Sequence, residues 1–293
     1  MTRTTLAPAK VNLFLHVGPP EADGRHGLCS LMVFADVGDQ VALSEANGLE
    51  LHIDGPFAAG LSAGEDNLVF RAAVAILARA RGPQTPFGLR LTKRLPVASG
   101  LGGGSSDAGA ALRLIREVVS PAIDDAALEA IAGELGSDGP ACLFGRPVWA
   151  EGRGERLSPA PILPALHAVL VNPRSPSSTA AVYGAFDAAG ARPRVDAPEA
   201  PADFETAEEL AAWLTGLRND LEAPAIRLNP AIGDVLETLA GEPETLLARV
   251  SGSGATCFAL CAGDIEAEGL AERLEMMRPD WWVKRCRLGG PWG

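Results

Sequence analysis

The chain has 293 residues, of which 47% are hydrophobic and 21% are charged. This length and composition are typical of a folded protein with a substantial core, in one large domain or two of ordinary size, and they exclude a disordered chain. The formal net charge of −12 argues against binding to nucleic acid or to an anionic membrane, because no excess of Lys and Arg can neutralise phosphates.

Five cysteines are widely spaced along the chain: Cys29, Cys142, Cys257, Cys261 and Cys286. Their odd number and the lack of a Cys-x-x-Cys pair predict neither a disulfide framework nor a zinc site, so we expect buried thiols and a cytoplasmic protein. No segment reaches the roughly 18–20 uninterrupted apolar residues of a membrane helix.

The N-terminal half is predicted to begin with a strand. Residues 9–17 have the period of a half-buried strand, with one face formed by Val11, Leu13, Leu15 and Val17. Further strand-like runs lie at 28–36, 40–44, 49–53 and 87–92.

Three helices are predicted among these strands. Asp66 or Asn67 is a suitable cap for a helix that runs to about Arg81. A second helix follows a glycine-rich stretch and has apolar residues along one face. A third spans roughly 124–135 and stops at Gly136.

The C-terminal half is predicted to start after a proline-rich region near residue 158, which divides the chain into domains 1–158 and 159–293. The Ala- and Pro-rich stretch 190–203 is expected to be an exposed loop. The remaining predicted elements are strands at 168–171, 247–250, 256–261 and 281–287 and helices at 206–217, 231–240 and 264–276. Strands and helices that occur in groups favour an α+β fold over a doubly wound parallel sheet.

One glycine-rich segment carries the clearest chemistry. It consists of Pro96, Val97, Ala98, Ser99, Gly100, Leu101, Gly102, Gly103, Gly104, Ser105 and Ser106. Glycines let backbone N–H groups approach an anion closely, and the segment runs directly into a helix whose N-terminus attracts negative charge. A flexible linker would not continue into an amphipathic helix, so we predict a phosphate-binding loop. The loop is neither a Walker A motif nor a dinucleotide fingerprint.

Three other segments accompany this loop in a characteristic order: Pro8–Leu13, Leu135–Pro140 and Val250–Ala255. With them, the chain resembles the galactokinase, homoserine kinase, mevalonate kinase and phosphomevalonate kinase (GHMP) superfamily. The resemblance implies a two-domain α+β fold, with an N-terminal domain similar to ribosomal protein S5 domain 2 and a ferredoxin-like C-terminal domain. It also implies an active site in the cleft between them.

Within the superfamily, six segments resemble a branch that phosphorylates an alcohol carrying a cytidine diphosphate group in non-mevalonate isoprenoid biosynthesis. They are residues 10–16, 23–26, 36–39, 66–70, 152–155 and 219–222. The implied substrate is a small molecule, and both a monomer and a homodimer are compatible with the sequence.

The resemblance assigns the catalytic pair. Asp138 would accept the proton of the substrate hydroxyl, and Lys10 would hold Asp138 in its charged form and share charge with the transferring phosphoryl group. Without the resemblance, Asp138 would be interpreted as a turn carboxylate. The alternative for Lys10 is a solvated strand lysine, but its flanking residues look half-buried, where an unpaired ammonium would be costly.

The resemblance also implies residues that bind the two substrates. Asn12, His26 and Tyr183 match positions that contact the cytidine diphosphate compound, and Arg25 stands where an aromatic residue is usual; its planar guanidinium can also stack on a base. Asn67 and Lys93 are expected to bind ATP together with the glycine-rich segment.

Ser106 is expected on the magnesium side of the ATP. No metal cluster of protein side chains is predicted, and Mg²⁺ should arrive with the nucleotide.

Two alternatives stay open at the level of sequence. One is a GHMP-family kinase for another small alcohol, which Arg25 and Gly27 favour because both depart from the usual pattern of the branch. The other is a non-catalytic nucleotide or sugar sensor on the same fold. A sensor is expected to have lost Lys10, Asp138 or the glycine-rich segment, and this chain keeps all three.

Overall fold

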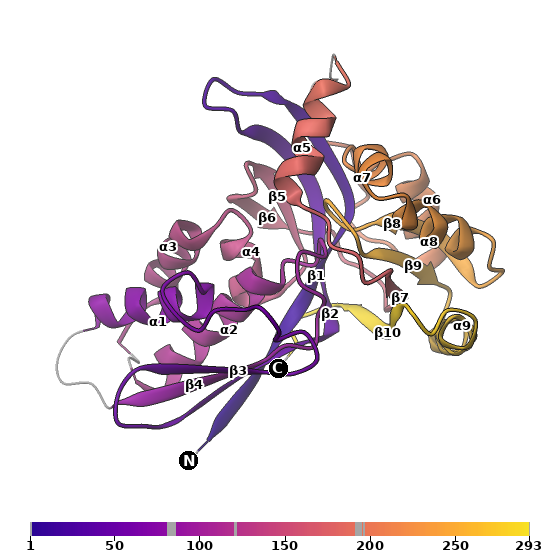
Figure 1. The fold of residues 1–293 in the computed structure, drawn as a ribbon. Helices are drawn as coiled ribbons and strands as arrows, with labels where there is room; N and C mark the ends of the chain where they lie inside the picture. The colour runs from indigo at the N-terminus through magenta and orange to yellow at the C-terminus, as the bar shows by residue number, and fades with distance from the viewer. Residues whose placement is uncertain (1, 81–85, 120–121, 191–194, 196, 293) are drawn as a thin grey trace.

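The computed structural model describes residues 2–80, 86–119, 122–190, 195 and 197–292. In this part of the chain the strands are β1 (Arg3–Pro20), β2 (His26–Glu45), β3 (Glu50–Asp54), β4 (Phe87–Thr92), β5 (Val148–Gly152), β6 (Arg156–Pro159), β7 (Leu166–Asn172), β8 (Thr245–Val250), β9 (Cys257–Cys261) and β10 (Trp282–Gly289). They belong to one sheet, whose main path has the order β3-β4-β2-β10-β7-β9-β8 (Figure 1).

The helices of the described residues are α1 (Leu68–Arg79), α2 (Gly103–Val118), α3 (Asp125–Leu135), α4 (Gly139–Phe144), α5 (Thr179–Ala188), α6 (Ala207–Thr215), α7 (Glu222–Leu228), α8 (Pro230–Ala240) and α9 (Asp264–Met277). Figure 1 shows α1 to α4 gathered near the N-terminal strands and α6 to α9 around the C-terminal strands. No helix of the described residues combines the length and the apolar character needed to cross a bilayer.

Strand β2 is 20 residues long, so it can pair with several other strands of the N-terminal half. Its first part pairs with β5, its last part pairs with β4, and β1 pairs along most of its length. The two separate strands predicted at 28–36 and 40–44 are therefore a single strand. The hairpin β5–β6, along with α4, α5 and α7, was not predicted.

The C-terminal half has the predicted ferredoxin-like topology. Its four strands follow the order β10-β7-β9-β8, and each pair of neighbours is antiparallel. In chain order this is the arrangement fourth, first, third, second that a split βαβ unit produces.

Some predicted boundaries shift or stay untested. Helix α1 ends at Arg79, and residue 81 lies outside the described residues. Of the predicted loop 190–203, residues 191–194 and 196 also lie outside them, and the others form neither helix nor strand. The predicted domain boundary at residue 158 falls within β6 and stays a prediction.

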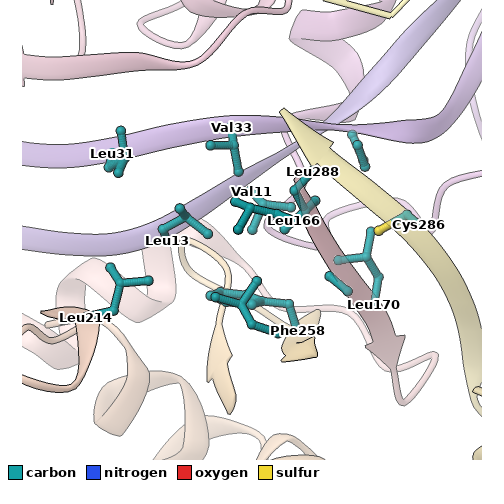
Figure 2. Packing of buried hydrophobic residues seen from close by; sticks show 14 of the residues in the cluster. Val11, Leu13, Leu31, Val33, Leu166, Leu170, Leu214, Phe258, Cys286 and Leu288 are labelled. Carbon is teal, nitrogen blue, oxygen red and sulfur yellow. The ribbon is translucent and has the colours of Figure 1, made fainter. Parts of the chain in front are cut away.

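A shared hydrophobic core joins the two halves. Strands β1 and β2 contribute Val11 and Leu31, and the C-terminal half contributes Leu170, Phe258 and Leu288, all at most 3% exposed. Figure 2 shows these side chains between the N-terminal hairpin and the strands of the second half. Since strand β10 pairs with both β2 and β7, the sheet is continuous across this core.

Candidate active site

A cavity of about 930 Å³ is lined by residues of both halves. Most of the predicted site residues line it: Lys10, Asn12, Arg25, His26, Asn67, Lys93, Pro96, Val97, Ala98, Ser99, Gly100, Gly102, Gly103, Gly104, Ser105, Asp138 and Tyr183. Its volume is in the range of a small-molecule site. Two predicted residues of the loop, Leu101 and Ser106, do not line the cavity and are fully buried.

The predicted catalytic pair is in contact. The Lys10 ammonium lies 3.2 Å from Oδ2 of Asp138 and donates to Oδ1 of Asn12 at 2.7 Å. Strand β1 fixes the lysine, whose side chain is 6% exposed, whereas the carboxylate of Asp138 is 32% exposed and precedes α4. A buried ammonium thus faces an accessible carboxylate that can reach a bound hydroxyl.

Asn12 belongs to a chain of polar contacts around this pair. Its Nδ2 donates to Oγ of Ser30 at 2.7 Å, and its backbone N–H donates to Oγ of Ser251 at 3.3 Å. The Ser251 hydroxyl in turn donates to the carbonyl of Gly100 at 3.0 Å. The C-terminal glycine turn therefore connects the strand of Lys10 to the phosphate-binding loop.

The loop presents the N-terminus of α2 to the cavity. Gly102 is the N-cap with φ +61°, and Gly103 and Gly104 form the first turn. Gly100 has φ +79°, and a Cβ atom there would lie 2.2 Å from the carbonyl oxygen of Ser251. The unpaired N–H groups and the dipole at the start of this 16-residue helix favour a phosphate.

Lys93, which was expected to bind ATP, lines the cavity and also makes ion pairs inside the protein. Its ammonium is buried, pairs with Asp39, and lies 2.7 Å from Oδ2 of Asp107. Asp39 also accepts from the backbone N–H groups of Arg94 and Leu95 at 2.5 and 2.9 Å. Because these carboxylates already engage its ammonium, Lys93 anchors the base of the phosphate-binding loop within the protein.

Burial changes the pKa values of Lys93 and Asp107 in this cluster. Burial raises the pKa of Asp107 to about 8 against the opposing charge of Lys93, and Asp39 adds to the rise. Burial lowers the pKa of Lys93, but the charges of Asp107 and Asp39 outweigh it and hold the value above normal. Asp107 therefore keeps a proton at neutral pH.

Two other residues expected at the ATP make contacts within the protein. Asn67 lines the cavity, and its amide also caps α1 by accepting from Val69 at 2.9 Å and donates to the carbonyl of Ser62 at 2.8 Å. Ser106, expected on the magnesium side, is fully buried beside the thiol of Cys142, and its role stays a prediction. Ser105 is the serine that lines the cavity.

The predicted substrate-binding residues gather at the end of the cavity near the β1–β2 hairpin. The rings of His26 and Tyr183 have centroids 4.9 Å apart, and Arg25 lines the same cavity. Figure 1 shows α5, which carries Tyr183, beside this hairpin. Burial, with a smaller effect of Asp138, raises the pKa of Tyr183 to about 12, so its hydroxyl stays protonated at neutral pH.

Four charged residues that line the cavity were given no role in the site by sequence reasoning: Asp66, Asp107, Arg153 and Asp187. Arg153 lies in the segment 152–155, which was noted as a match without a role; its guanidinium lies 2.6 Å from Glu21 and 2.9 Å from Asp23. Asp187 lies on α5, a helix that was not predicted. Because α5 was not predicted, the position of this acidic residue in its last turn, where it opposes the helix dipole, was not available as a signal.

All five cysteines are buried and carry free thiols, and their predicted burial is confirmed. Among the described residues, no group of three or more His, Cys, Asp or Glu side chains is placed to hold a metal ion.

Family patterns match both halves of the chain. The GHMP kinases N terminal domain matches residues 67–146, and the GHMP kinases C terminal domain matches residues 198–277. The predicted superfamily and its α+β fold are thereby confirmed.

Individual proteins match nearly the whole chain. The chain is 65% identical to the 4-diphosphocytidyl-2-C-methyl-D-erythritol kinase of Caulobacter sp. (strain K31), over 99% of this chain and 100% of that protein. It is 63% identical to the protein of the same name in Caulobacter vibrioides (strain NA1000 / CB15N), over 98% and 100%. A crystal structure of 4-(cytidine 5'-diphospho)-2C-methyl-D-erythritol kinase superposes with a TM-score of 0.78 at 34% identity, over 99% of this chain and 100% of that chain.

Proposed function

Because this chain belongs to the 4-diphosphocytidyl-2-C-methyl-D-erythritol kinase family of the GHMP kinases, we propose that Asp138 and Lys10 carry out its phosphoryl transfer. Family membership makes the protein an ATP-dependent small-molecule kinase of isoprenoid biosynthesis. The acceptor is the 2-hydroxyl of 4-diphosphocytidyl-2-C-methyl-D-erythritol. The contact of 3.2 Å between Lys10 and Asp138 at an accessible carboxylate is the observation that carries the residue assignment.

The transfer begins when Asp138 accepts the proton of the 2-hydroxyl. The oxygen then bonds to the γ-phosphorus, the bond from this phosphorus to the β–γ bridging oxygen breaks, and ADP leaves. Lys10 stabilises the negative charge on Asp138 and on the transferring group. Asp138 afterwards releases its proton to solvent.

The phosphates of ATP bind at the N-terminus of α2, where the N–H groups of Gly103 and Gly104 face the cavity. Leu61, Leu68 and Leu91 supply apolar walls in the same cavity. Mg²⁺ would enter with ATP, because kinase sites hold it by phosphates and one or two protein oxygens. The Ser105 hydroxyl is a suitable oxygen, and the ion would neutralise phosphate charge.

The cytidine diphosphate end of the substrate binds near the β1–β2 hairpin. His26 and Tyr183 form one wall there, and Asn12 lies beside the catalytic pair. Arg25, at the same end of the cavity, can stack its guanidinium on the base or contact a phosphate.

The buried free thiols suit a reducing compartment, and the cytoplasm is the compartment we propose.

The first test is the replacement Asp138→Asn, which keeps the shape of the side chain and removes the base. We expect kcat with 4-diphosphocytidyl-2-C-methyl-D-erythritol to fall by about 10²- to 10⁴-fold, while the dissociation constant of ATP changes little. ADP release and ATP titration measure these two quantities.

Asp124→Asn is the matched control, because Asp124 also precedes a helix but does not line the cavity. Undiminished turnover in Asp138→Asn would refute the assigned base. Mevalonate and homoserine should give no ADP release with the unmodified enzyme, and turnover of either would refute the assigned substrate.

A further inference from the structure

Ser30 carries a buried hydroxyl that has no role in the transfer described above. It lies on strand β2 between two neighbouring strands, where it pairs with Leu15 of β1 and Ala150 of β5. Its exposed fraction is 0%, and it does not line the cavity. A buried hydroxyl is costly unless it finds hydrogen-bond partners, so the contacts of Ser30 indicate its function.

The partners of Ser30 determine the direction of both of its hydrogen bonds. Oγ lies 2.6 Å from the carbonyl oxygen of Phe14 and 2.7 Å from Nδ2 of Asn12. A hydroxyl has one hydrogen, and since a carbonyl only accepts, that hydrogen points to Phe14. Oγ therefore presents a lone pair to Asn12, and only the NH₂ end of the amide can face it.

The opposite end of the same amide faces the Lys10 ammonium. Oδ1 of Asn12 accepts from Nζ at 2.7 Å, and Nζ also lies 3.2 Å from Oδ2 of Asp138. A flipped amide would set two donors against each other at Lys10 and two acceptors against each other at Ser30. The groups on both sides thus select one orientation of Asn12.

The orientation of Asn12 in turn determines that of the ammonium. The three N–H bonds of an ammonium are tetrahedral, so contacts to Asn12 and Asp138 that fix two of them also fix the third. Lysine has a flexible stem, and it therefore needs fixed acceptors to hold its charge in one place. Charge that is positioned before the reaction stabilises the transition state most, and a displacement of about 1 Å can cost 10²-fold in rate.

We propose that Ser30 is a positioning residue for the phosphoryl transfer: its hydroxyl fixes the amide of Asn12, which fixes the ammonium of Lys10. This inference rests on the proposed function, because it concerns how the lysine of that reaction is held. Since Ser30 does not line the cavity, it affects the rate of transfer and not the binding of ATP or of the alcohol.

The test is Ser30→Ala, which removes the hydroxyl and leaves the NH₂ group of Asn12 without this acceptor. We expect kcat to fall by about 10- to 100-fold, while KM for the alcohol and the dissociation constant of ATP stay within about twofold. Ser30→Thr keeps a hydroxyl and suits a strand, so it should retain kcat within about threefold. Thermal unfolding checks that each variant is folded at the assay temperature.

Ser175→Ala is the matched control. Its hydroxyl also accepts from an asparagine amide, Nδ2 of Asn229 at 2.7 Å, but Ser175 does not line the cavity. Loss of this second serine–asparagine hydrogen bond should leave kcat unchanged.

A double-mutant cycle with Asn12→Ala separates positioning from a general loss of structure. If Ser30 acts through Asn12, Ser30→Ala should lower kcat by less than about twofold once Asn12 is alanine. A merely structural role would lower kcat by the same factor in both backgrounds. Equal factors, an unchanged kcat in Ser30→Ala, or an equal loss in Ser30→Thr would each overturn the proposal.

The cycle is measured with whichever alcohol the enzyme phosphorylates. Turnover of mevalonate or homoserine would refute the proposed substrate and leave the test of Ser30 in place. Undiminished turnover in Asp138→Asn would refute the assigned base, while non-additive effects of Ser30 and Asn12 would still support the positioning role. Additive effects alongside normal turnover of 4-diphosphocytidyl-2-C-methyl-D-erythritol would overturn the role of Ser30 and retain the proposed function.

Discussion

Lys10 and Lys93 are equally buried, at 5% exposure each, but their partners give them different functions. The carboxylate beside Lys10 is 32% exposed, so it remains available to a substrate. The carboxylates beside Lys93 are 0% and 4% exposed and bind the lysine to the interior. The exposure of the acidic partner therefore distinguishes Lys10, for which we propose a catalytic role, from Lys93, which is paired in the interior.

The proton on Asp107 should make stability depend on pH. Its folded pKa is raised to about 8 from the ordinary value 3.8, so between these values the folded state holds a proton that the unfolded chain has lost. Its contribution to the free energy of unfolding should therefore be largest below about pH 4 and fall up to about pH 8. Asp107→Asn, which is always neutral, should remove this fall, as urea unfolding at several pH values would measure.

The test compares the free energy of unfolding of the unmodified enzyme with that of Asp107→Asn at each pH. The contributions of the other carboxyl groups are the same in both proteins and cancel in this difference. Asp234→Asn, which changes an exposed carboxylate on α8, should give a nearly constant difference over the same range. A constant difference for Asp107→Asn as well would mean that Asp107 is ionised in the folded protein at neutral pH.

Sequence patterns predicted most of the residues that line the cavity, but not the ion pairs and hydrogen bonds that their polar groups make. Lys10 and Asp138 belong to ordered motifs, and the fold brings them into contact. The ion pair of Lys93 could not be predicted, because its partner Asp39 lies 54 residues away in the chain and only the fold brings the two together. The burial of Ser106 was not predicted either, because only the helical turn decides that its neighbour Ser105 lines the cavity.

At the scale of elements, the phosphate-binding loop is held from both sides by backbone contacts. The Leu101 carbonyl accepts from the N–H of Lys10 at 2.8 Å, and the Ser99 carbonyl accepts from Thr256 at 2.9 Å. With the bond from Ser251 to Gly100, these contacts fix the loop between β1 and the C-terminal glycine turn. The position of the loop is thereby coupled to the position of Lys10.

Replacing Gly100 by alanine should disrupt this coupling. The new Cβ would lie 2.2 Å from the Ser251 carbonyl oxygen, so the loop and the glycine turn would have to separate. We expect ATP affinity and kcat each to fall by at least about tenfold, because small displacements of a positioned phosphate are costly. ATP titration and ADP release measure both.

Gly60→Ala is a matched control for this change. Gly60 has φ +81°, close to the +79° of Gly100, but nothing lies within 4 Å of its added Cβ. It should lose only about 1–2 kcal/mol of stability from the left-handed backbone and keep its activity. Equal losses of activity in both variants would assign the effect to backbone strain instead of the loop contact.

The elements that were missed are those whose patterns are weak or short. Helix α4 has six residues, too few for a periodic pattern, and is positioned by packing. Helix α5 is rich in alanine, and only Val182 and Phe186 are buried on it. Strand β2 was split in two because residues around Gly38 interrupt the apolar alternation, although the pairing with β1 continues past them.

At the scale of the whole molecule, the two halves share one sheet and one core. The last strand of the chain, β10, lies between β2 and β7, so the C-terminus completes the sheet of both halves. Phe258 contributes to the same cluster as Val11 and Leu31 of the N-terminal hairpin. The cavity is lined from both halves, and it therefore depends on this junction.

This arrangement predicts that the halves lose their structure together. Phe258→Ala removes a fully buried ring at the junction (Figure 2) and should lower the free energy of unfolding by about 3–5 kcal/mol. Ile265→Ala, which truncates an apolar side chain that is 82% exposed, should change it by less than about 0.5 kcal/mol. Tryptophan fluorescence and binding of a fluorescent ATP analogue should be lost in one coincident transition with denaturant. If nucleotide binding survived after the fluorescence transition, the N-terminal half would be stable alone, and the shared core would not govern the stability of the site.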